Sequence, residues 1–265
     1  MGRIEDVFRE RKSPAFIGFT VAGDPCQKTS IRIAKALIAG GTDILELGVP
    51  FSDPVADGPT IQRADERALS SGTTTDTIFG IVREIRKESA VPIVFLTYYN
   101  TVLHRGIRNF YREAQESGVD GILIADMPVE ESEEVTRIAA ACDIAPIFLI
   151  APTTTDARIQ KIVKQAEGYL YLVAVLGVTG VRKTVSSDAI DLLRRVRMHT
   201  DLPLALGFGI SSPEHARACA AGGADGVIVG SAIVNIVEQH LEDLPAMERE
   251  LRGYVSRMKE GAGSI

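Results

Sequence analysis

The sequence predicts an α/β protein, a single (β/α)8 TIM barrel that comprises residues 1–265. Short apolar runs alternate with amphipathic, helix-like segments, which is typical of a parallel sheet covered on its faces. There are eight such runs, and 265 residues suit one barrel of about 250 residues better than two medium-sized domains. An open, doubly wound sheet also alternates helices and strands, but eight units in this length favour the closed barrel.

Three segments resemble one another and indicate a repeated αβ unit. They are AGGTDILELG from Ala39, ESGVDGILIAD from Glu116 and AGGADGVIVG from Ala221. In each, a glycine able to end a helix in the left-handed conformation precedes an aspartate and a short apolar strand. The aspartates are Asp43, Asp120 and Asp225. Their separations of 77 and 105 residues predict two units and nearly three units between them.

Five further strands are expected at apolar runs between these repeats. They are residues 15–21, 92–98, 145–150, 169–175 and 203–209. The first dozen residues predict an extra N-terminal helix, and extra helices are expected near the loop at Gly230 and after Ile233. The last residues, 261–265, are expected to form a frayed tail.

The composition excludes several classes of function. A formal charge of −6 and the absence of a run of Lys and Arg argue against nucleic-acid binding. No apolar stretch reaches the ~20 residues of a membrane helix, and the charged N-terminus lacks the features of a signal peptide. Three cysteines without metal-type spacing fit a reducing compartment. We therefore expect a cytoplasmic protein that does not associate with membranes.

Three glycine-bearing loops follow the sixth, seventh and eighth expected strands. They are GVTG at 177–180, GFGIS at 207–211 and Gly230–Ser231. Any one of them could simply form a tight turn. Because all three lie where barrels commonly bind phosphate, and because glycine lets backbone N–H groups approach an anion, together they predict a phosphate site. No Lys or Arg is evident there, so backbone amides and Ser231 are expected to bind the phosphate.

The segment ELGVPFSDPVADGPTIQ, residues 46–62, contains the candidate acid–base groups. Glu46 lies near the end of an otherwise apolar strand, where an unpaired carboxylate is costly. It is either a structural ion pair or hydrogen-bonding group, or a general acid–base with a raised pKa. Asp57 follows in a proline-restricted loop and either positions its side chain for chemistry or caps the next helix.

Other chemistries are disfavoured by the residues present. No expected strand ends in the buried lysine that a Schiff-base aldolase needs, and Lys183 lies in a glycine-bearing loop. The four histidines are scattered, so we expect no metal site. Dinucleotide, Walker and nucleophile-elbow motifs are also absent. The chemistry that remains is carboxylate chemistry on a phosphorylated substrate, with no metal and no cofactor in this chain.

The segment at 46–62 resembles the signature of the tryptophan synthase α-subunit family, and its length makes a chance match unrealistic. GFTVAGDP (18–25), ADMPVEES (125–132), GVTG and GFGIS also resemble family motifs in the expected order. This resemblance covers almost the whole chain. It implies a barrel that cleaves indole-3-glycerol phosphate to indole and glyceraldehyde 3-phosphate. It also implies an α2β2 complex in which a β subunit, which binds pyridoxal phosphate, receives the indole.

The resemblance also implies roles for individual residues. Glu46 matches the principal acid–base and Asp57 the second catalytic carboxylate. The residues that match substrate-binding positions are Phe19, Leu96, Tyr98, Leu123, Ala125, Tyr171, Thr179 and Ile228, with Tyr171 placed to hydrogen-bond near Glu46. Those that match the phosphate site are Gly180, Phe208, Gly209, Gly230 and Ser231.

Residues 176–186 resemble the family's mobile lid, in which Thr179 would meet Asp57 on closure. Many members carry an arginine shortly before GVTG, whereas this chain has Val175-Leu176. Asn100, Pro128 and residues 50–53 match positions near the β-subunit interface. Three other interpretations stay open: a stand-alone lyase that releases indole, a non-catalytic regulator, and a different phosphate-binding barrel such as a sugar-phosphate isomerase.

Overall fold

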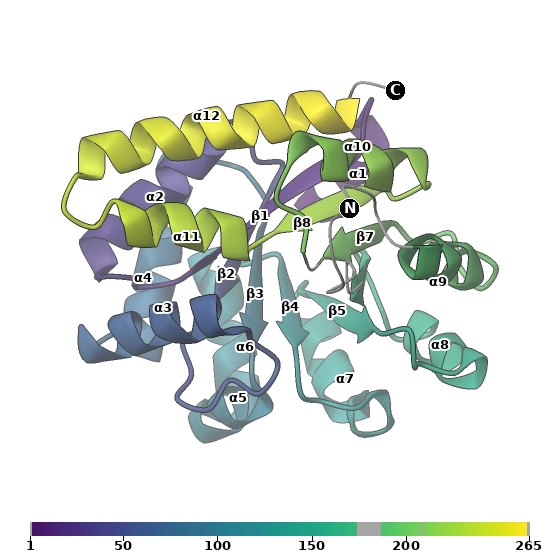
Figure 1. The fold of residues 1–265 in the computed structure, drawn as a ribbon. Helices are drawn as coiled ribbons and strands as arrows, with labels where there is room; N and C mark the ends of the chain where they lie inside the picture. Colours follow the sequence, from purple (N-terminus) through teal and green to yellow (C-terminus); the bar gives the residue numbers. More distant parts are fainter. Residues whose placement is uncertain (1, 174–186, 208, 264–265) are drawn as a thin grey trace.

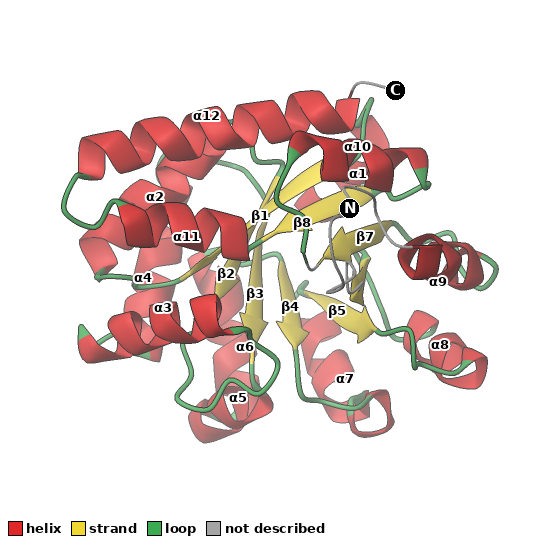
Figure 2. Ribbon diagram, in the orientation of Figure 1, coloured by secondary structure: helices red, strands yellow, loops and turns green. Residues whose placement is uncertain are grey.

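The computed structural model describes residues 2–173, 187–207 and 209–263, and it forms a closed parallel barrel. Each strand pairs with the next along the chain, and the last pairs with the first, with Ala15 opposite Gly226 and Ile17 opposite Ile228. The strands occupy the centre of the molecule and the helices surround them (Figure 2). The predicted (β/α)8 barrel is therefore confirmed, and the open doubly wound sheet is excluded.

All eight strands lie where the sequence predicts them, with ends that shift by one or two residues. They are β1 (Ala15–Val21), β2 (Ile44–Gly48), β3 (Ile93–Thr97), β4 (Gly121–Ile124), β5 (Ala145–Ile150), β6 (Leu170–Val173), β7 (Leu204–Gly207) and β8 (Gly226–Val229). The predicted sixth strand extended to Val175, but residues beyond Val173 lie outside the described part of the chain.

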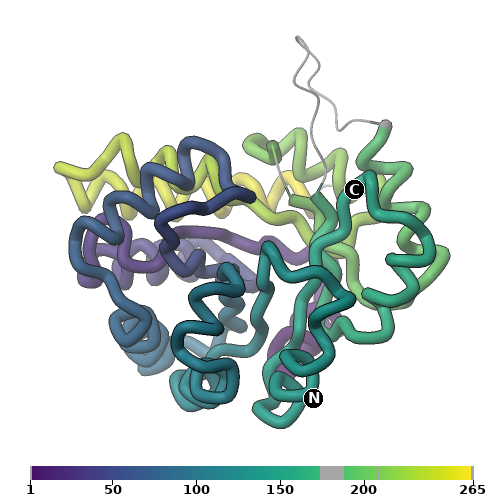
Figure 3. Tube along the Cα trace, turned by 90° about the horizontal axis from the view of Figure 1, so that it is seen from below, coloured from purple at the N-terminus to yellow at the C-terminus, as the bar shows by residue number. Residues whose placement is uncertain are grey.

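The helices form the outer layer of the barrel. They are α1 (Arg3–Glu10), α2 (Gln27–Ala39), α3 (Pro59–Ser70), α4 (Thr75–Arg86), α5 (Tyr99–Arg105), α6 (Ile107–Ser117), α7 (Glu133–Ala141), α8 (Asp156–Val163), α9 (Ser187–Arg197), α10 (Pro213–Ala221), α11 (Ser231–Gln239) and α12 (Leu244–Gly263), with a 3-10 turn at Val129–Glu131. Figures 1 and 3 show this ring of helices from two directions, with α12 lying across α2 and α10 in Figure 1. The extra helices expected at the N-terminus, after Gly230 and near the C-terminus are confirmed.

The repeated aspartate joins neighbouring strands at their amino ends. Its carboxylate accepts a hydrogen bond from the first or second residue of the preceding strand. The bonds are Phe16 N–H to Asp43 Oδ2 (2.8 Å), Ile93 N–H to Asp120 Oδ2 (2.8 Å) and Leu204 N–H to Asp225 Oδ2 (2.9 Å). Two residues before each aspartate, a glycine adopts the predicted left-handed conformation: Gly41, Gly118 and Gly223 have φ of 104°, 99° and 92°.

One expectation about these repeats is wrong. The 105 residues between Asp120 and Asp225 extend from β4 to β8 and therefore contain four strand–helix units, not nearly three. The unit that begins β6 has Gly168-Tyr169 in place of the motif, so the repeat is not visible there in the sequence.

Each repeat aspartate also pairs with a cation from a distant part of the chain. Lys259 Nζ lies 2.8 Å from Asp43, and Arg3 lies 2.8 Å from Asp120, which also pairs with Arg86 at 2.5 Å. Arg11 and Arg197 both pair with Asp225. Partly buried carboxylates are tolerated where hydrogen bonds and opposite charges compensate their desolvation, and all three meet this condition.

Helix α1 covers the amino end of the barrel interior. Ile4 and Phe8 from α1 are buried in the interior cluster, where Phe8 packs against Tyr169 with ring centroids 5.8 Å apart. The larger hydrophobic cluster lies outside the strands, between the barrel and its helices. Because apolar packing closes the amino end, the interior is accessible to a ligand from the carboxyl ends of the strands.

The expected frayed tail is wrong for residues 261–263. Helix α12 continues to Gly263, and Ala262 is 1% exposed. Gly261 approaches Pro213 so closely that a Cβ atom would lie 2.6 Å from the Pro213 carbonyl oxygen. Within the described residues, no helix is both long and apolar enough to cross a membrane.

Candidate active site

The inward-facing side chains of the strands form the base of the candidate site. Side chains alternate along a strand, so Ile44 and Glu46 of β2 point into the barrel while Leu45 and Leu47 point toward the helices. Glu46 is opposite Phe19 of β1 in the strand register. Gly48 leaves room for this ring, since a Cβ atom there would lie 2.7 Å from the Phe19 side chain.

Glu46 is fully buried, and neither carboxyl oxygen has a hydrogen-bond partner in the described part of the chain. Burial raises its pKa to about 8, and the charge of Asp57 contributes in the same direction. Glu46 in turn raises the pKa values of Tyr169 and Tyr171, after the larger effect of their burial. Tyr171 and Glu46 form no hydrogen bond with each other in the described residues, although the two groups interact electrostatically. The structural ion pair considered for Glu46 is also not formed in the described residues.

Asp57 is held by a tyrosine instead of capping a helix. Tyr98 Oη donates to Asp57 Oδ2 at 2.7 Å and accepts from the Ala56 N–H at 3.1 Å. The Tyr98 ring stacks on Phe51, with centroids 4.9 Å apart. Gly58, not Asp57, is the N-cap of α3, and it provides no side-chain cap. Burial raises the pKa of Asp57, while the hydrogen bond from Tyr98 opposes that rise.

A cavity of about 330 Å³ opens at the carboxyl ends of the strands. This volume is within the usual range for a small-molecule site. Its lining residues are Phe19, Asp57, Gly58, Ile61, Leu96, Tyr171, Gly209, Ile210, Ser211, Ile228, Gly230, Ser231, Ala232 and Asn235. One wall is apolar or aromatic, and the wall formed by β7 and β8 is rich in glycine and serine. None of these lining residues carries a positive charge.

The glycine- and serine-rich wall consists of two loop–helix junctions. Gly209 has φ of 77°, a conformation that favours glycine, and Ser231 is the first residue of α11. Ser212 caps α10, as expected of a serine followed by a proline at the start of a helix: its hydroxyl accepts from the His215 N–H, and Pro213 is the first helical residue. Ser211 is held at both backbone groups, because Tyr254 Oη donates to its carbonyl at 3.1 Å and its N–H donates to His215 Nδ1 at 3.4 Å. Backbone N–H groups at such junctions favour an anion.

The cavity brings together most of the residues that the sequence indicates. Phe19, Asp57, Leu96, Tyr171, Gly209, Ile228, Gly230 and Ser231 line it. Tyr98 lies behind Asp57, and Glu46 adjoins the cavity through its neighbours Phe19 and Tyr171. Leu123 and Ala125 point into the barrel, but Ala125 lines a separate cavity of about 200 Å³ near the carboxyl ends of β4, β5 and β6. The remaining predicted residues lie outside the described part of the chain. They are Thr179 and Gly180, which belong to residues 174–186 together with Val175-Leu176, and Phe208.

Several lining residues are missed by sequence reasoning. They are Gly58, Ile61, Ala232 and Asn235, whereas Ile210 and Ser211 belong to the GFGIS loop that the sequence assigns to the phosphate site. Ile61 follows Asp57 by four residues, and Asn235 follows Ser231 by four. Residues four apart share one face of a helix, so helical spacing from Ser231 was a signal for Asn235. In the described part of the chain, no group of three or more His, Cys, Asp or Glu side chains could hold a metal ion.

The fold and this site define a class of protein: a barrel enzyme with one buried and one partly buried carboxyl group at a pocket at the carboxyl ends of its strands. The sequence matches the tryptophan synthase alpha chain family over residues 6–263. A tryptophan synthase alpha chain from Methanoregula boonei is 69% identical over 262 residues, which are 99% of both chains. One from Methanothermobacter thermautotrophicus is 44% identical and covers 98% of this chain and 96% of its own.

Solved structures agree with this assignment. Tryptophan synthase subunit alpha from Legionella pneumophila superposes with a TM-score of 0.91 at 33% identity and covers 100% of both chains. A chain from the tryptophan synthase a2b2 complex of Pyrococcus furiosus gives a TM-score of 0.88 at 41% identity and covers 94% of this chain and 99% of its own. The chain belongs to the tryptophan synthase alpha chain family. Enzymes of this family are carbon–carbon lyases that cleave indole-3-glycerol phosphate, as the resemblance of the sequence implied.

Proposed function

We propose that this chain cleaves indole-3-glycerol phosphate by a retro-aldol reaction in which Glu46 and Asp57 have separate roles. The observation that carries the proposal is the Glu46 carboxyl group, fully buried beside the cavity and without a hydrogen-bond partner in the described residues. A carboxyl group with its pKa raised to about 8 is protonated at neutral pH, so it is able to act first as an acid.

Glu46 moves two protons in one turnover. Its carboxylic acid donates a proton to C3 of the indole ring, and the carboxylate that forms then takes the proton of the side-chain hydroxyl next to the breaking bond. The electrons of the carbon–carbon bond return to the ring as that bond breaks, and the hydroxyl carbon becomes the aldehyde of glyceraldehyde 3-phosphate. The protons balance, and Glu46 ends the cycle protonated.

Asp57 stabilises the positive charge that develops on the indole nitrogen when C3 is protonated. This role needs an ionised carboxylate, and the hydrogen bond from Tyr98 favours that form. The indole ring lies in apolar surroundings from which it displaces water. These are formed by Phe19, Leu96, Leu123, Ala125, Tyr171 and Ile228. Two carboxyl groups with opposite protonation states are plausible only because their environments differ.

The phosphate group binds at the glycine- and serine-rich wall. Gly209, Gly230 and Ser231 supply backbone N–H groups there, and Ser231 also supplies a hydroxyl. Gly180 and Phe208 belong to the same proposed set, and Thr179 is assigned to the lid over the substrate. The N-terminal end of α11 favours a negative charge, which compensates for the absence of a cation from the described lining.

The chain acts as one domain with a tryptophan synthase β subunit as its partner in an α2β2 complex, and it works in the cytoplasm. Related chains from Pyrococcus furiosus come from a2b2 complexes. Here the loop that carries Asp57 also presents Val55, which is 84% exposed, and Leu103 on nearby α5 is 53% exposed. Residues 50–53, Asn100 and Pro128 belong to this proposed face. Pyridoxal phosphate is the partner's cofactor, and this chain's reaction uses none.

The test is the release of indole from indole-3-glycerol phosphate by the purified chain, with and without a β subunit. We expect weak activity alone and a strong increase with the partner, because closure of a site often depends on the bound subunit. Glu46→Gln should lower kcat by about 10³-fold, since general acid–base groups contribute ~10²–10⁴-fold. Asp57→Asn should lower kcat while substrate binding persists.

The matched control for Glu46→Gln is Glu46→Asp, which retains a carboxyl group but moves it away from the substrate because the side chain is shorter. We expect this variant to keep part of the activity that Glu46→Gln loses. The outcomes also separate the alternatives. Full activity without the partner would indicate a stand-alone lyase that releases free indole. Binding of substrate by a folded chain that never cleaves it would leave a regulatory role.

A further inference from the structure

Helix α3 carries a buried carboxyl group for which the proposed reaction has no use. The buried face of this helix consists of Ile61, Ala64, Asp65 and Ala68, and Asp65 is only 4% exposed. The three apolar members pack in one cluster with Phe19 and Val234 next to the cavity. Asp65 lies on this buried face, close enough to Phe51 and Asp57 in the preceding loop to interact with both.

The groups that act on Asp65 are mostly other carboxyl groups. Asp57 from the loop, Asp24 from the segment after β1 and neighbouring Glu66 all disfavour its ionised form. Tyr98, at the end of β3, interacts with it as well. The one interaction that favours its ionised form is with the Phe51 backbone, and Oδ2 has no partner in the described residues. No salt bridge to Asp65 occurs in the part of the chain that the structure describes.

Asp24 provides an internal comparison, because it is buried in the same region and is ion-paired. Arg67 donates to both Asp24 oxygens, at 2.7 and 2.8 Å, and also contacts Glu238. Arg67 is therefore committed to Asp24, although it lies only two residues from Asp65 on the same helix. A buried carboxylate without a cation is costly, and such a group usually takes a proton instead.

We propose that Asp65 is a positioning residue that is held as a neutral carboxylic acid against the loop of Phe51 and Asp57, so that Asp57 stays the ionised member of the pair. Asp65 interacts with the Phe51 backbone and fixes the start of this loop. Its proton removes the repulsion that a second anion would exert on Asp57. The functional part of this inference rests on the proposed role of Asp57, while the protonation of Asp65 does not.

The direction of titration supports this assignment. Burial and then the charge of Asp57 raise the pKa of Asp65 to about 8. The hydroxyl of Tyr98 favours the ionised form of Asp57, whereas the ionised form of Asp65 is favoured only by the Phe51 backbone. The two groups titrate as a coupled pair, and the first proton lost from the pair belongs mainly to Asp57.

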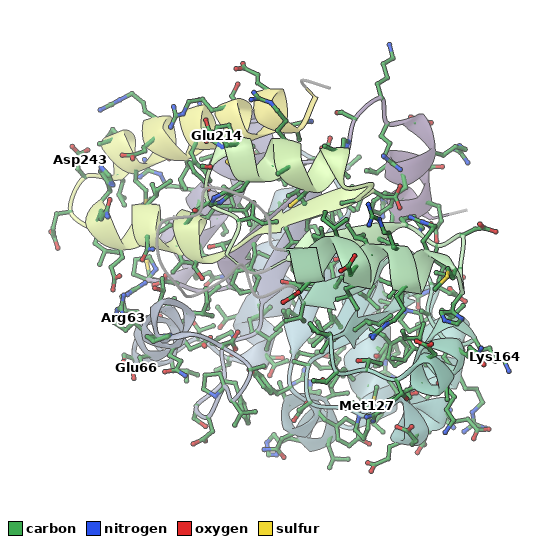
Figure 4. All side chains as sticks on the ribbon, turned by 45° about the vertical axis from the view of Figure 1, so that its right-hand side comes forward. Arg63, Glu66, Met127, Lys164, Glu214 and Asp243 are labelled. Atoms are coloured by element: carbon green, nitrogen blue, oxygen red, sulfur yellow. The ribbon has the colours of Figure 1, made fainter. Side chains whose placement is uncertain are left out.

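The test compares the full chain with Asp65→Asn in urea unfolding as a function of pH. The native state keeps the Asp65 proton that the unfolded chain releases above its ordinary pKa of 3.8, so the wild type loses stability relative to the variant as pH rises. The variant's midpoint should exceed that of the wild type by a margin that grows from about pH 4 to about pH 8 and then levels. Glu66→Gln is the matched control, because Glu66 is the next residue and lies on the outer face of α3 (Figure 4). The margin between Glu66→Gln and the wild type should change much less over this range, because Glu66 is the smallest of the charges that act on Asp65.

Lyase kinetics with the β subunit then test the positioning role. Asp65→Asn, which keeps a hydrogen-bond acceptor and has no charge, should retain kcat within about twofold. Asp65→Leu removes the carboxyl group that interacts with the Phe51 backbone and should lower kcat by about tenfold with a smaller change in KM. A cooperative urea transition confirms that each variant is folded.

A margin between wild type and Asp65→Asn that stays constant with pH would overturn the proposal, because Asp65 would then be ionised. Equal activity in Asp65→Leu and Asp65→Asn would overturn the positioning role. If the wild type and all variants were inactive but the pH-dependent margin were observed, the proposed lyase function would be rejected. The conclusion that Asp65 is a neutral carboxylic acid would still hold.

Discussion

The two ends of the barrel use carboxyl groups in opposite ways. At the amino ends of the strands, Asp43, Asp120 and Asp225 each accept a backbone hydrogen bond and pair with at least one cation. At the carboxyl ends, Glu46 and Asp57 form no salt bridge in the described residues, and their pKa values are raised. The difference lies in the counter-charges: cations pair with the aspartates at the amino ends, and none pairs with Glu46 or Asp57 in the described residues.

This comparison explains how one fold combines stability with reactivity. A paired carboxylate is fixed in its ionised form and contributes to stability, but it is a poor proton donor near neutral pH. An unpaired, buried carboxyl group keeps its proton and costs stability as pH rises. The amino end, closed by α1, is therefore suited to support the barrel, while the open carboxyl end is suited to chemistry.

The largest expected effect is on the pH dependence of stability in Glu46→Gln. The folded-state pKa of Glu46 is about 8 and the reference value is 4.5, so the contribution of Glu46 to stability is complete below about pH 4.5 and is lost as pH rises to about 8. Glu46→Gln has no titrating group at this position and therefore does not lose this stability as pH rises. Its free energy of unfolding should exceed that of the wild type by on the order of 4 kcal/mol at about pH 8, as measured by guanidinium unfolding.

The same measurement at about pH 4.5 should give nearly equal stabilities for the two proteins. A Glu46→Gln variant that is less stable than the wild type at every pH would contradict the comparison. It would mean that Glu46 is ionised and that a partner compensates its charge.

The next largest effect is expected for Asp225→Ala at the opposite end. This change removes the partner of Arg11 and Arg197 and leaves the Leu204 N–H without its acceptor. We expect the free energy of unfolding to fall by about 3 kcal/mol, because a network that is broken on one side leaves charges and donors uncompensated. kcat should not change, since the site lies at the far end of the strands.

Asp6→Ala is the matched control for this prediction. Asp6 pairs with Arg9, and both side chains are more than 40% exposed, so its loss should cost about 0.5 kcal/mol. If Asp225→Ala cost no more than this control, the ion pairs at the amino end would have no special part in stability, and the contrast between the two ends would fail.

The elements that the sequence predicts correctly are those that depend on local signals. The glycines before Asp43, Asp120 and Asp225 adopt the left-handed conformation because helix termination is decided within a few residues. Glu46 was identifiable because a carboxylate in an apolar strand requires an explanation. Ser212 and Pro213 begin α10 for equally local reasons.

The features that were missed depend on contacts between distant segments. The helical end of α12 is ordered by the contact of Gly261 with Pro213, which no local pattern reveals. The sequence suggested that Asp57 either caps a helix or acts in chemistry, and only the contact with Tyr98, 41 residues away, decides its environment. The cation partners of the repeat aspartates are similarly remote, since Lys259 and Asp43 are 216 residues apart.

The smallest expected effect tests whether a neutral hydrogen bond at the carboxyl end replaces the cations of the amino end. Tyr98→Phe removes the hydroxyl that donates to Asp57 and accepts from Ala56, while the ring can still stack on Phe51. A hydrogen bond to a charged group contributes about 1.5 kcal/mol, so kcat should fall by about tenfold. Because Asp57 loses a group that favours its ionised form, the acidic limb of the pH–rate profile should move to higher pH. An unchanged limb would mean that Tyr98 serves only to pack the loop, and the ionised state of Asp57 would then need another source.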